Sequence, residues 1–313
     1  MKTFVTGGTG FIGSKLVDRL IKRGDTVTVY DNLSSGKKEF VDVHNSNKNF
    51  TFVKADLLDF DTLKKSIQGH DIVFHLAANA DIRYGTEHPR HDLEQNLLAT
   101  YNVLEATRQN NIKKLVFSST SAVFGKPTTI PTPEDYGPAL PASLYGASKL
   151  SCEAFISAYA NLYDMQVWIF RFANVIGQRV THGILYDFLD KLKKNPNELE
   201  ILGDGEQEKS YLYDEDCVDA MLFVIGHVNE KVSIFNLGSN DQIKIKKIAK
   251  IIVEELGLKP HFMFTGGPVG WKGDVPRMAL DTRKIAKLGW KPKYSSEEAV
   301  RLSVQGLKKT FLL

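Results

Sequence analysis

A glycine-rich turn near the start of the chain limits the fold more than any other feature of the sequence. Residues 2–6 have the apolar character of a short strand, and apolar residues recur at helical spacing over 16–21. Between them lies the pattern G-x-x-G-x-x-G, whose glycines allow a tight turn and a close approach of the backbone to a pyrophosphate at the helix N-terminus. The strand–turn–helix context therefore predicts a dinucleotide-binding unit. The residues of this predicted cofactor turn are Gly7, Gly10, Phe11, Ile12 and Gly13.

The rest of the first half alternates strand and helix patterns. Strands are expected at residues 26–30, 50–54, 71–76 and 114–118, with a long helix over 89–110. The last of these strands is almost continuously apolar, which is typical of a parallel strand buried on both faces. Alternation at this spacing predicts βαβ units and an α/β fold with a doubly wound parallel sheet.

Acidic and small residues follow the predicted strands. Asp31, at the end of the second strand, could accept hydrogen bonds from an adenosine ribose, and it would repel a 2′-phosphate. It therefore favours NAD over NADP, although Lys37 and Lys38 in the next loop weaken that choice. Asp56 could bind the adenine amino group or could simply cap a turn. The further cofactor-binding candidates are Asn32, Asp56, Leu57, Leu76, Ala77, Ala78, Asn96 and Ser118.

Tyr145 and Lys149 are the candidate catalytic pair. Four residues apart on a helix, their side chains share one face. An ammonium group held close to a phenol lowers the phenol pKa, so that Tyr145 could exchange a proton with a sugar or alcohol hydroxyl. The alternative is an ordinary amphipathic helix start with a solvated Lys149. A hydroxyl cluster over 118–121, at the carboxyl end of a predicted strand, could contact a substrate oxygen or only stabilise a turn.

Composition excludes several classes of function. The chain has 313 residues, is 42% hydrophobic and 25% charged, and carries a net charge of +3, too small to indicate binding to nucleic acid or to an anionic membrane. No apolar run approaches the ~18 residues of a membrane span, and the N-terminus leads directly into a strand. Cys152 and Cys217 form no C-x-x-C pattern, so neither a disulfide framework nor a metal site is expected. We expect a cytoplasmic protein.

These motifs together resemble those of extended short-chain dehydrogenases/reductases. Among these the chain is most similar to nucleotide-sugar 4-epimerases of the UDP-glucose 4-epimerase type, over nearly its whole length. The resemblance implies a Rossmann domain over residues 1–175 with a returning strand near 232–238, and a smaller, interleaved α/β substrate-binding domain over most of 176–313. It rests on the glycine turn, Asp31, Asp56-Leu57, His75 to Ala78, Asn96, the hydroxyl cluster, the Tyr145–Lys149 pair and Arg171 to Gly177.

The resemblance also implies a mechanism. Tyr145 would be the base for the sugar 4-hydroxyl, Lys149 would lower its pKa and bind the nicotinamide ribose, and Thr120 would assist at the same hydroxyl. NAD would take a hydride from C4, the 4-keto sugar would turn over, and the hydride would return to its other face, so that NAD is retained. Related dehydratases have Asp-Glu after the threonine, and related decarboxylases keep the glutamate. Here these positions are Ser121 and Ala122, which favours plain epimerisation.

In the second half the chain departs from the family pattern at two positions. Lys209 replaces an arginine, and lysine lacks the bidentate fork that suits phosphate. Alternatively, residues 199–213 form a surface hairpin with a solvated lysine. Trp271 replaces a phosphate-binding arginine, or it is a core residue instead. Lys272 or Arg277 could take the place of the missing arginine. The candidate substrate-binding residues are Thr120, Ser121, Tyr145, Asn174, Lys209, Tyr211 and Asp274.

Several functions remain open from the sequence. The first is interconversion of UDP-glucose and UDP-galactose, and the second is epimerisation of another sugar such as UDP-glucuronate or a UDP-N-acetylhexosamine. An oxidoreductase that releases NADH and a non-catalytic NAD-sensing module are further alternatives. Relatives commonly form homodimers through the two helices that here begin near Pro89 and Tyr145.

Overall fold

The computed structural model describes residues 1–268, 270 and 277–311. The chain divides into two compact units. The first, unit 1, contains Met1–Lys126, Gly137–Arg171 and Met221–Phe235. The second, unit 2, contains Pro127–Tyr136, Phe172–Ala220 and Asn236–Leu313. The chain therefore crosses between the units several times.

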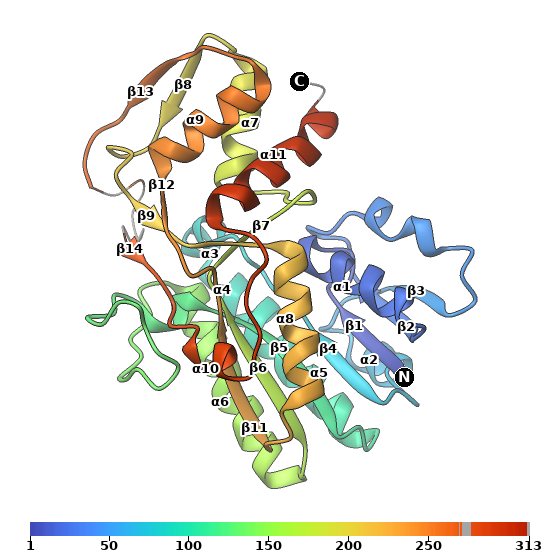
Figure 1. Cartoon of the computed structure of the whole chain (residues 1–313). Helices are drawn as coiled ribbons and strands as arrows, with labels where there is room; N and C mark the ends of the chain where they lie inside the picture. The colour runs from blue at the N-terminus through green and yellow to red at the C-terminus, as the bar shows by residue number, and fades with distance from the viewer. Residues whose placement is uncertain (269, 271–276, 312–313) are drawn as a thin grey trace. The chain divides into compact units, whose positions relative to one another are not determined.

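A seven-stranded sheet forms the centre of unit 1, in the order β11-β6-β5-β4-β1-β2-β3 (Figure 1). Strand β1 pairs in parallel with both β2 and β4, so the strand order reverses direction at β1. The predicted α/β fold with a doubly wound parallel sheet is confirmed. The strands are β1 (Lys2–Thr6), β2 (Thr26–Asp31), β3 (Phe50–Lys54), β4 (Ile72–His75), β5 (Lys114–Thr120), β6 (Gln166–Phe172) and β11 (Val232–Leu237).

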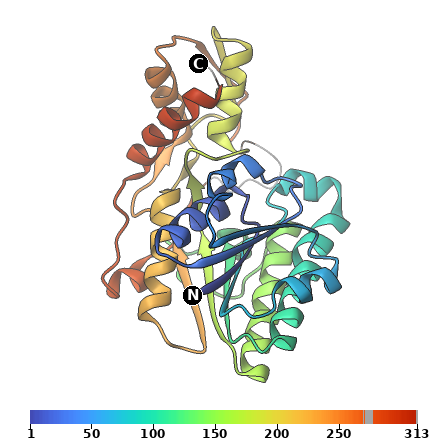
Figure 2. The ribbon, with the colours of Figure 1, turned by 90° about the vertical axis from the view of Figure 1, so that its right-hand side faces the viewer.

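Helices cover both faces of this sheet. Helix α1 lies on one face, and α5 and α6 lie side by side on the other (Figure 2). The predicted helix over 89–110 is present, but its middle turn is a π-helix that carries Asn96. The helices are α1 (Phe11–Lys22), η1 (Lys38–Phe40), η2 (Asp42–His44), α2 (Phe60–Ser66), α3 (Ile82–Glu87), α4 (Pro89–Asp92), η3 (Leu93–Leu98), α5 (Ala99–Gln109), η4 (Ser121–Phe124) and α6 (Leu144–Tyr163).

The proline-rich segment Pro127–Tyr136 belongs to unit 2, although the residues on either side of it belong to unit 1. Thr132 is completely buried, and its backbone N–H donates to the Ala279 carbonyl at 2.9 Å. Its own carbonyl accepts from the Asp281 N–H at 2.9 Å and from the Asn236 amide at 3.0 Å. These contacts join residues more than one hundred positions apart, so no local pattern could have predicted them.

Unit 2 contains small sheets and packed helices. Two-stranded sheets join β7 to β10 and β8 to β13, and β9 lies between β12 and β14. Residues 199–213 are therefore not a hairpin, because β8, β9 and β10 pair with different partners. The elements are β7 (Asn174–Ile176), α7 (Ile184–Lys194), β8 (Glu198–Ile201), β9 (Glu208–Lys209), β10 (Tyr211–Tyr213), α8 (Asp214–His227), β12 (Ile243–Lys244), α9 (Ile245–Leu256), β13 (His261–Phe264), β14 (Arg277–Met278), α10 (Arg283–Lys287) and α11 (Ser296–Phe311). Helix α8 begins in unit 2 and ends in unit 1.

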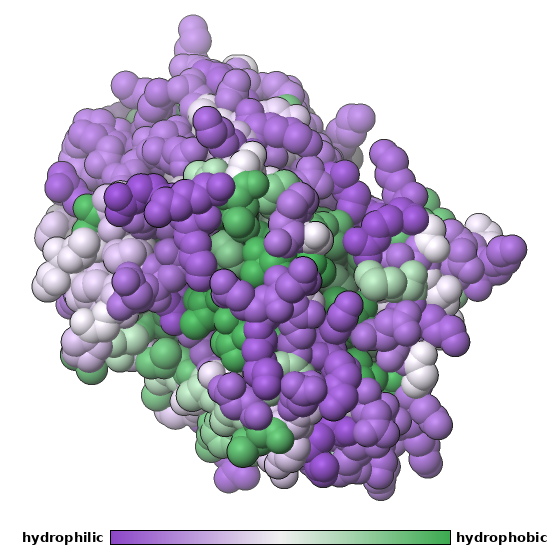
Figure 3. All heavy atoms as spheres, turned by 60° about the horizontal axis from the view of Figure 1, so that its bottom comes forward, coloured by the Kyte–Doolittle hydropathy of each residue, from purple (hydrophilic) through white to green (hydrophobic). Residues whose placement is uncertain are grey.

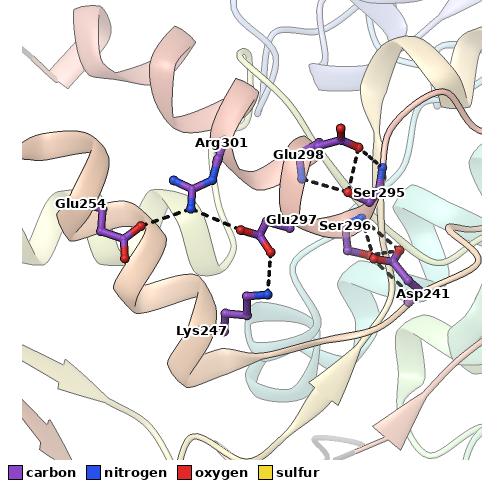
Figure 4. Close-up of polar contacts among 8 residues, drawn as sticks. All are labelled: Asp241, Lys247, Glu254, Ser295, Ser296, Glu297, Glu298 and Arg301. Atoms are coloured by element: carbon purple, nitrogen blue, oxygen red, sulfur yellow. Dashed lines mark hydrogen bonds and ion pairs between the residues drawn. The ribbon is translucent and has the colours of Figure 1, made fainter.

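Charged side chains join α9 to α11 on the surface of unit 2 (Figure 4). Arg301 contacts Glu254 at 3.1 Å and Glu297 at 3.2 Å. Lys247 contacts the other oxygen of Glu297 at 2.5 Å. All four side chains are at least one-third exposed, so each pair contributes at most about 1 kcal/mol to stability.

The start of α11 is a capping box. The Ser295 N–H donates to the Glu298 carboxylate at 2.8 Å, and the Glu298 N–H donates back to the Ser295 hydroxyl at 3.3 Å (Figure 4). The neighbouring Ser296 hydroxyl donates to Asp241 at 2.9 Å and accepts the Tyr211 N–H at 3.0 Å. These bonds tie the start of the closing helix to strand β10.

Within the described part of the chain, no helix is both long and apolar enough to cross a membrane. The same residues include no group of three or more His, Cys, Asp or Glu side chains arranged to hold a metal ion. Cys152 and Cys217 are buried free thiols.

Candidate active site

In the glycine turn, the surrounding backbone excludes a side chain at Gly7 and Gly13 but leaves space at Gly10. Gly7 has φ +69°, and a Cβ there would lie 2.6 Å from the Ala77 nitrogen. A Cβ on Gly13 would lie 2.0 Å from the Gly7 carbonyl oxygen. A Cβ on Gly10 would meet only that oxygen, at 3.1 Å, and Gly10 has ordinary extended dihedrals. The space at Gly10, before the first N–H groups of α1, fits a pyrophosphate.

Asp31 holds the glycine turn against the end of β2. Its carboxylate accepts the Thr9 N–H at 3.0 Å and the Leu33 N–H at 2.9 Å. A carboxylate has about four acceptor positions, so ribose hydroxyls could still bind it. In the following loop Lys38 is paired with Asp42, and Lys37 lies 3.8 Å from Glu39. Both lysines thus face carboxylates of their own loop.

Asp56 caps a turn at the end of β3, as one of its two sequence interpretations proposed. It accepts the Leu58 N–H at 2.8 Å and the Asn32 amide at 2.8 Å. The Leu57 carbonyl accepts the Asn102 amide at 2.9 Å. Asn32, Asp56 and Leu57 are therefore brought together beyond the adjacent strands β2 and β3.

Beyond β4, small side chains let the backbone approach the glycine turn. The Leu76 N–H donates to the Thr6 carbonyl at 3.1 Å, and Ala77 and Ala78 are only partly buried. Asn96 lies deeper, at 2% exposure, and its amide oxygen accepts the Asn79 N–H at 2.8 Å. The cofactor candidates from β1, β2, β3 and β4 thus lie at one edge of the sheet, where dinucleotides bind in doubly wound folds.

The structure brings Tyr145, Lys149 and the hydroxyl cluster together. The Thr120 side chain, at the end of β5, lies close enough to Tyr145 to lower its pKa. Lys149 is buried, and its ammonium donates to the Ser118 carbonyl at 2.7 Å. Helix α6 begins close to η4, since a Cβ on Gly146 would lie 2.5 Å from the Ala122 carbonyl oxygen. The alternative of a solvated Lys149 is therefore wrong.

Burial governs the acidity of both groups. It raises the pKa of Tyr145 to about 12, and the hydrogen bond from Thr120 only partly offsets this. Burial also lowers the pKa of Lys149 to about 8, against the opposing effect of Cys152 and Glu153. In the protein alone the pKa of Tyr145 is thus raised and not lowered, because desolvation has the largest effect.

Sequence reasoning missed a buried ion pair behind these residues. Arg171, at the end of β6, binds Glu153 of α6 through Nε at 3.0 Å and Nη2 at 2.6 Å. Glu153 also accepts a hydrogen bond from the Ser119 hydroxyl, and Arg171 stacks on the Phe124 ring at 4.7 Å. Glu153 follows Lys149 by four residues, so helical spacing was a signal that could have revealed it.

Three of the substrate candidates, Asn174, Lys209 and Tyr211, lie in strands of unit 2. Asn174 pairs with Tyr211 between β7 and β10, and its amide donates to the Ser210 carbonyl at 3.2 Å. Tyr211 is 4% exposed. Lys209 lies in β9 beside Met278 of β14.

Arg277, one of the two candidate substitutes for the missing arginine, is exposed at the start of β14. It pairs with Glu208 of β9. Trp271, Lys272 and Asp274 lie outside the described residues.

This arrangement defines a class of protein. A dinucleotide cradle and a tyrosine–lysine–hydroxyl group at the same sheet edge can move a hydride and a proton at an alcohol carbon. The chain belongs to the NAD dependent epimerase/dehydratase family, whose sequence model matches residues 3–238. The expected cofactor, NAD, is the cofactor of this family.

Relatives within the family have different activities. The UDP-glucose 4-epimerase of Mycolicibacterium smegmatis is 33% identical over 312 residues, covering 97% of this chain and 98% of its own. A solved UDP-glucose 4-epimerase of Thermotoga maritima, with UDP-glucose, has a TM-score of 0.90 at 34% identity and covers 99% of both chains. UDP-glucuronic acid decarboxylase 2 of Arabidopsis thaliana is 31% identical over 317 residues, covering 98% of this chain and 68% of its own.

Proposed function

We propose that this protein interconverts UDP-glucose and UDP-galactose by NAD-dependent epimerisation at C4 of the sugar. The observation that carries the proposal is the placement of the Tyr145 phenol beside the Thr120 side chain and on one helix face with buried Lys149, with no carboxylate at positions 121 and 122. Two relatives with high coverage are 4-epimerases of this substrate, which supports the same function.

In this proposal each residue has a separate role. Tyr145 takes the proton of the 4-hydroxyl, Thr120 hydrogen-bonds the same oxygen, and Lys149 holds the nicotinamide ribose. Bound NAD supplies the acceptor and donor of the C4 hydride, and the positive charge of its oxidised ring favours the phenolate form of a nearby tyrosine. A Tyr145 pKa of about 12 in the protein alone therefore suits a base that becomes active once the site is loaded.

Residues Ser121 and Ala122 restrict the chemistry. Elimination of water from the sugar requires an acid and a base near C5 and C6. Neither a hydroxymethyl nor a methyl side chain supplies that carboxylate, and the Ala122 N–H is bonded to Thr120 at 3.1 Å. This favours plain epimerisation over dehydration or decarboxylation.

Substrate binding is proposed for Ser121, Asn174, Lys209, Tyr211 and Asp274. Lys209 would supply charge to the nucleotide diphosphate. Arg277 is our candidate for the missing arginine, because its strand pairs with the strand of Lys209. Tyr211 is buried, so it would act mainly by holding the strand beside Asn174.

An equilibrium assay tests the proposal. Purified protein is given UDP-galactose without added NAD, and UDP-glucose is measured. Conversion is expected, because an epimerase regenerates and retains its NAD. Absence of conversion, repeated with NAD supplied, would rule out the UDP-hexose assignment.

The substitutions at Lys209 and Trp271 favour a second candidate, an epimerase of another nucleotide sugar such as UDP-glucuronate or a UDP-N-acetylhexosamine. The same assay with these sugars distinguishes the two. Formation of NADH in proportion to oxidised sugar, without epimer, would instead identify an oxidoreductase. A cytoplasmic location stays a prediction from cysteine content.

We also propose a homodimer through η3, α5 and α6. Figure 3 shows hydrophobic residues gathered among hydrophilic ones on the face that comes forward from the bottom of Figure 1. On η3, α5 and α6, six large apolar side chains are more than 40% exposed: Leu93, Leu98, Tyr101, Leu144, Phe155 and Leu162. Exposed apolar residues of two packed helices are typical of a subunit interface. Light scattering should give twice the mass of the chain, and Phe155→Glu should give a monomer.

A further inference from the structure

Asp92 is a buried carboxylate to which the proposed reaction assigns no role. It is the last residue of α4 and is 1% exposed. Its Oδ1 accepts hydrogen bonds from the Asn79 amide at 2.8 Å and the Asn96 amide at 3.2 Å. Its Oδ2 is buried without a hydrogen-bond partner among the described residues. A buried carboxylate with one unsatisfied oxygen is costly and requires an explanation.

A glycine of the neighbouring helix α3 leaves space for this carboxylate. Gly85 of α3 packs against Asp92, and a Cβ there would lie 2.1 Å from Oδ2. Any other residue at position 85 would displace the carboxylate. The close packing of α3 against α4 thus fixes the buried position of the Asp92 side chain.

Hydrogen bonds lead from Asp92 to the catalytic helix. The Asn96 amide that contacts Asp92 also donates to the Ser148 hydroxyl at 2.9 Å. The Ser148 hydroxyl in turn donates to the Tyr145 carbonyl at 2.8 Å. Asp92 and Asn79 therefore determine how the Asn96 amide is turned, and Asn96 contacts the first turn of α6.

We propose that Asp92 is a positioning residue for the reaction: through Asn96 and Ser148 it holds the first turn of α6 and, with it, Tyr145, while placing a negative charge near the tyrosine. The kinetic consequences rest on the proposed epimerase function, whereas the structural and titration consequences do not.

The charge of Asp92 acts against early ionisation of Tyr145. The groups that affect the Tyr145 pKa are Thr120 of β5, which lowers it, and Asp92 and Cys152, which raise it after burial. Lys149 lies on the same helix face. Burial raises the pKa of Asp92 above its ordinary value. The Asn79 and Asn96 amides and His91 favour the charged carboxylate, and Asp81 opposes it. Asp92 thus helps to keep Tyr145 protonated until positive charge arrives at the site.

The test compares Asp92→Asn, which keeps the shape and one acceptor oxygen, with Asp92→Ala, which loses both hydrogen bonds. Phenolate absorbance is titrated for each protein and for its Tyr145→Phe counterpart, so that the difference reports Tyr145 alone. We expect the Tyr145 transition about one pH unit lower in Asp92→Asn, because a like charge has been removed. Glu94→Gln, whose carboxylate pairs with Arg90 at 2.6 Å, should leave it unchanged.

Kinetics supply the second readout. Asp92→Ala should lose about tenfold or more in kcat with little change in KM, since Tyr145 is displaced while substrate contacts remain. The acid limb of the Asp92→Asn pH profile should move to lower pH. A merely structural role would lower the melting temperature of both variants and leave the Tyr145 titration unmoved, and that result would overturn the proposal. If the unmodified protein converts no nucleotide sugar, the proposed function fails, yet the titration still decides the role of Asp92.

Discussion

The two units of the chain place their charged groups differently. In unit 1 the Arg171 and Glu153 side chains are 8% and 5% exposed, and Glu153 lies one helical turn from Lys149. In unit 2 the Arg301 and Glu254 side chains are 36% and 59% exposed, between two surface helices. Buried charges must be paired with good geometry, whereas exposed pairs are screened by water. The comparison indicates that the Arg171–Glu153 pair of unit 1 helps to shape a site, whereas the Arg301–Glu254 pair of unit 2 covers a surface.

The largest expected effect is on chemistry in unit 1. Tyr145→Phe should lower kcat by about a thousandfold or more, because the proton acceptor at the sugar hydroxyl is lost. Bound NAD, measured after denaturation of the purified protein, should be unchanged. Lys209→Ala in unit 2 is the matched comparison and should mainly raise KM. Near-normal turnover of Tyr145→Phe would contradict the assignment of the proton-transfer step to unit 1.

The buried and exposed ion pairs should differ in stability. Glu153→Gln should reduce the free energy of unfolding by about 3–5 kcal/mol, because it leaves Arg171 buried without its counter-charge. Arg301→Gln should cost at most about 1 kcal/mol. Urea unfolding of both variants at one pH measures the difference. Equal losses would show that burial does not separate the two pairs.

Within unit 1, two glycines of the cofactor turn should differ in their roles, one in stability and the other in cofactor binding. Gly7→Ala should destabilise the fold by about 1–3 kcal/mol, because φ is +69° and the new Cβ would meet Ala77. Gly10→Ala should leave the melting temperature nearly unchanged and weaken NAD binding about tenfold, since its Cβ would occupy the space assigned to the pyrophosphate. Calorimetric titration with NAD checks the second variant, and normal affinity there would argue against the proposed cradle.

The most gradual expected effect is a pH dependence of stability. His75 lies between the Thr6 and Thr100 hydroxyls at 2.7 and 2.9 Å, and burial lowers its pKa from 6.5 to about 3. The neutral native imidazole contributes its full stability above about pH 6.5. As pH falls from 6.5 towards 3, this contribution is lost at about 1.4 kcal/mol per pH unit, because the unfolded state binds the proton first.

His75→Gln is the corresponding variant. Its free energy of unfolding should decline less steeply over that range, even though it is lower at neutral pH. Urea titrations at several pH values provide the measurement. A slope equal to that of the unmodified protein would mean that carboxylates alone account for the acid sensitivity.

The sequence predicted the parts of the site that depend on neighbours along the chain. The glycine turn needs only a strand before it and a helix after it, and the Tyr145–Lys149 pair needs only helical spacing. The doubly wound parallel sheet followed from alternating strand and helix patterns. Asp31 and Asp56 were located because polar residues that end parallel strands meet at one sheet edge.

Contacts between residues that are distant in the sequence became known only from the tertiary structure. Arg171 meets Glu153 and Asp92 reaches the Tyr145 helix through Asn96, while Pro127–Tyr136 joins unit 2 through Thr132. No periodicity records such pairings, because they depend on how strands and helices pack. Burial likewise is a property of the folded chain, and it raises the Tyr145 pKa where the sequence suggested a lowered one. The sequence by itself therefore determined which groups this protein brings to its site, and packing determined their environment.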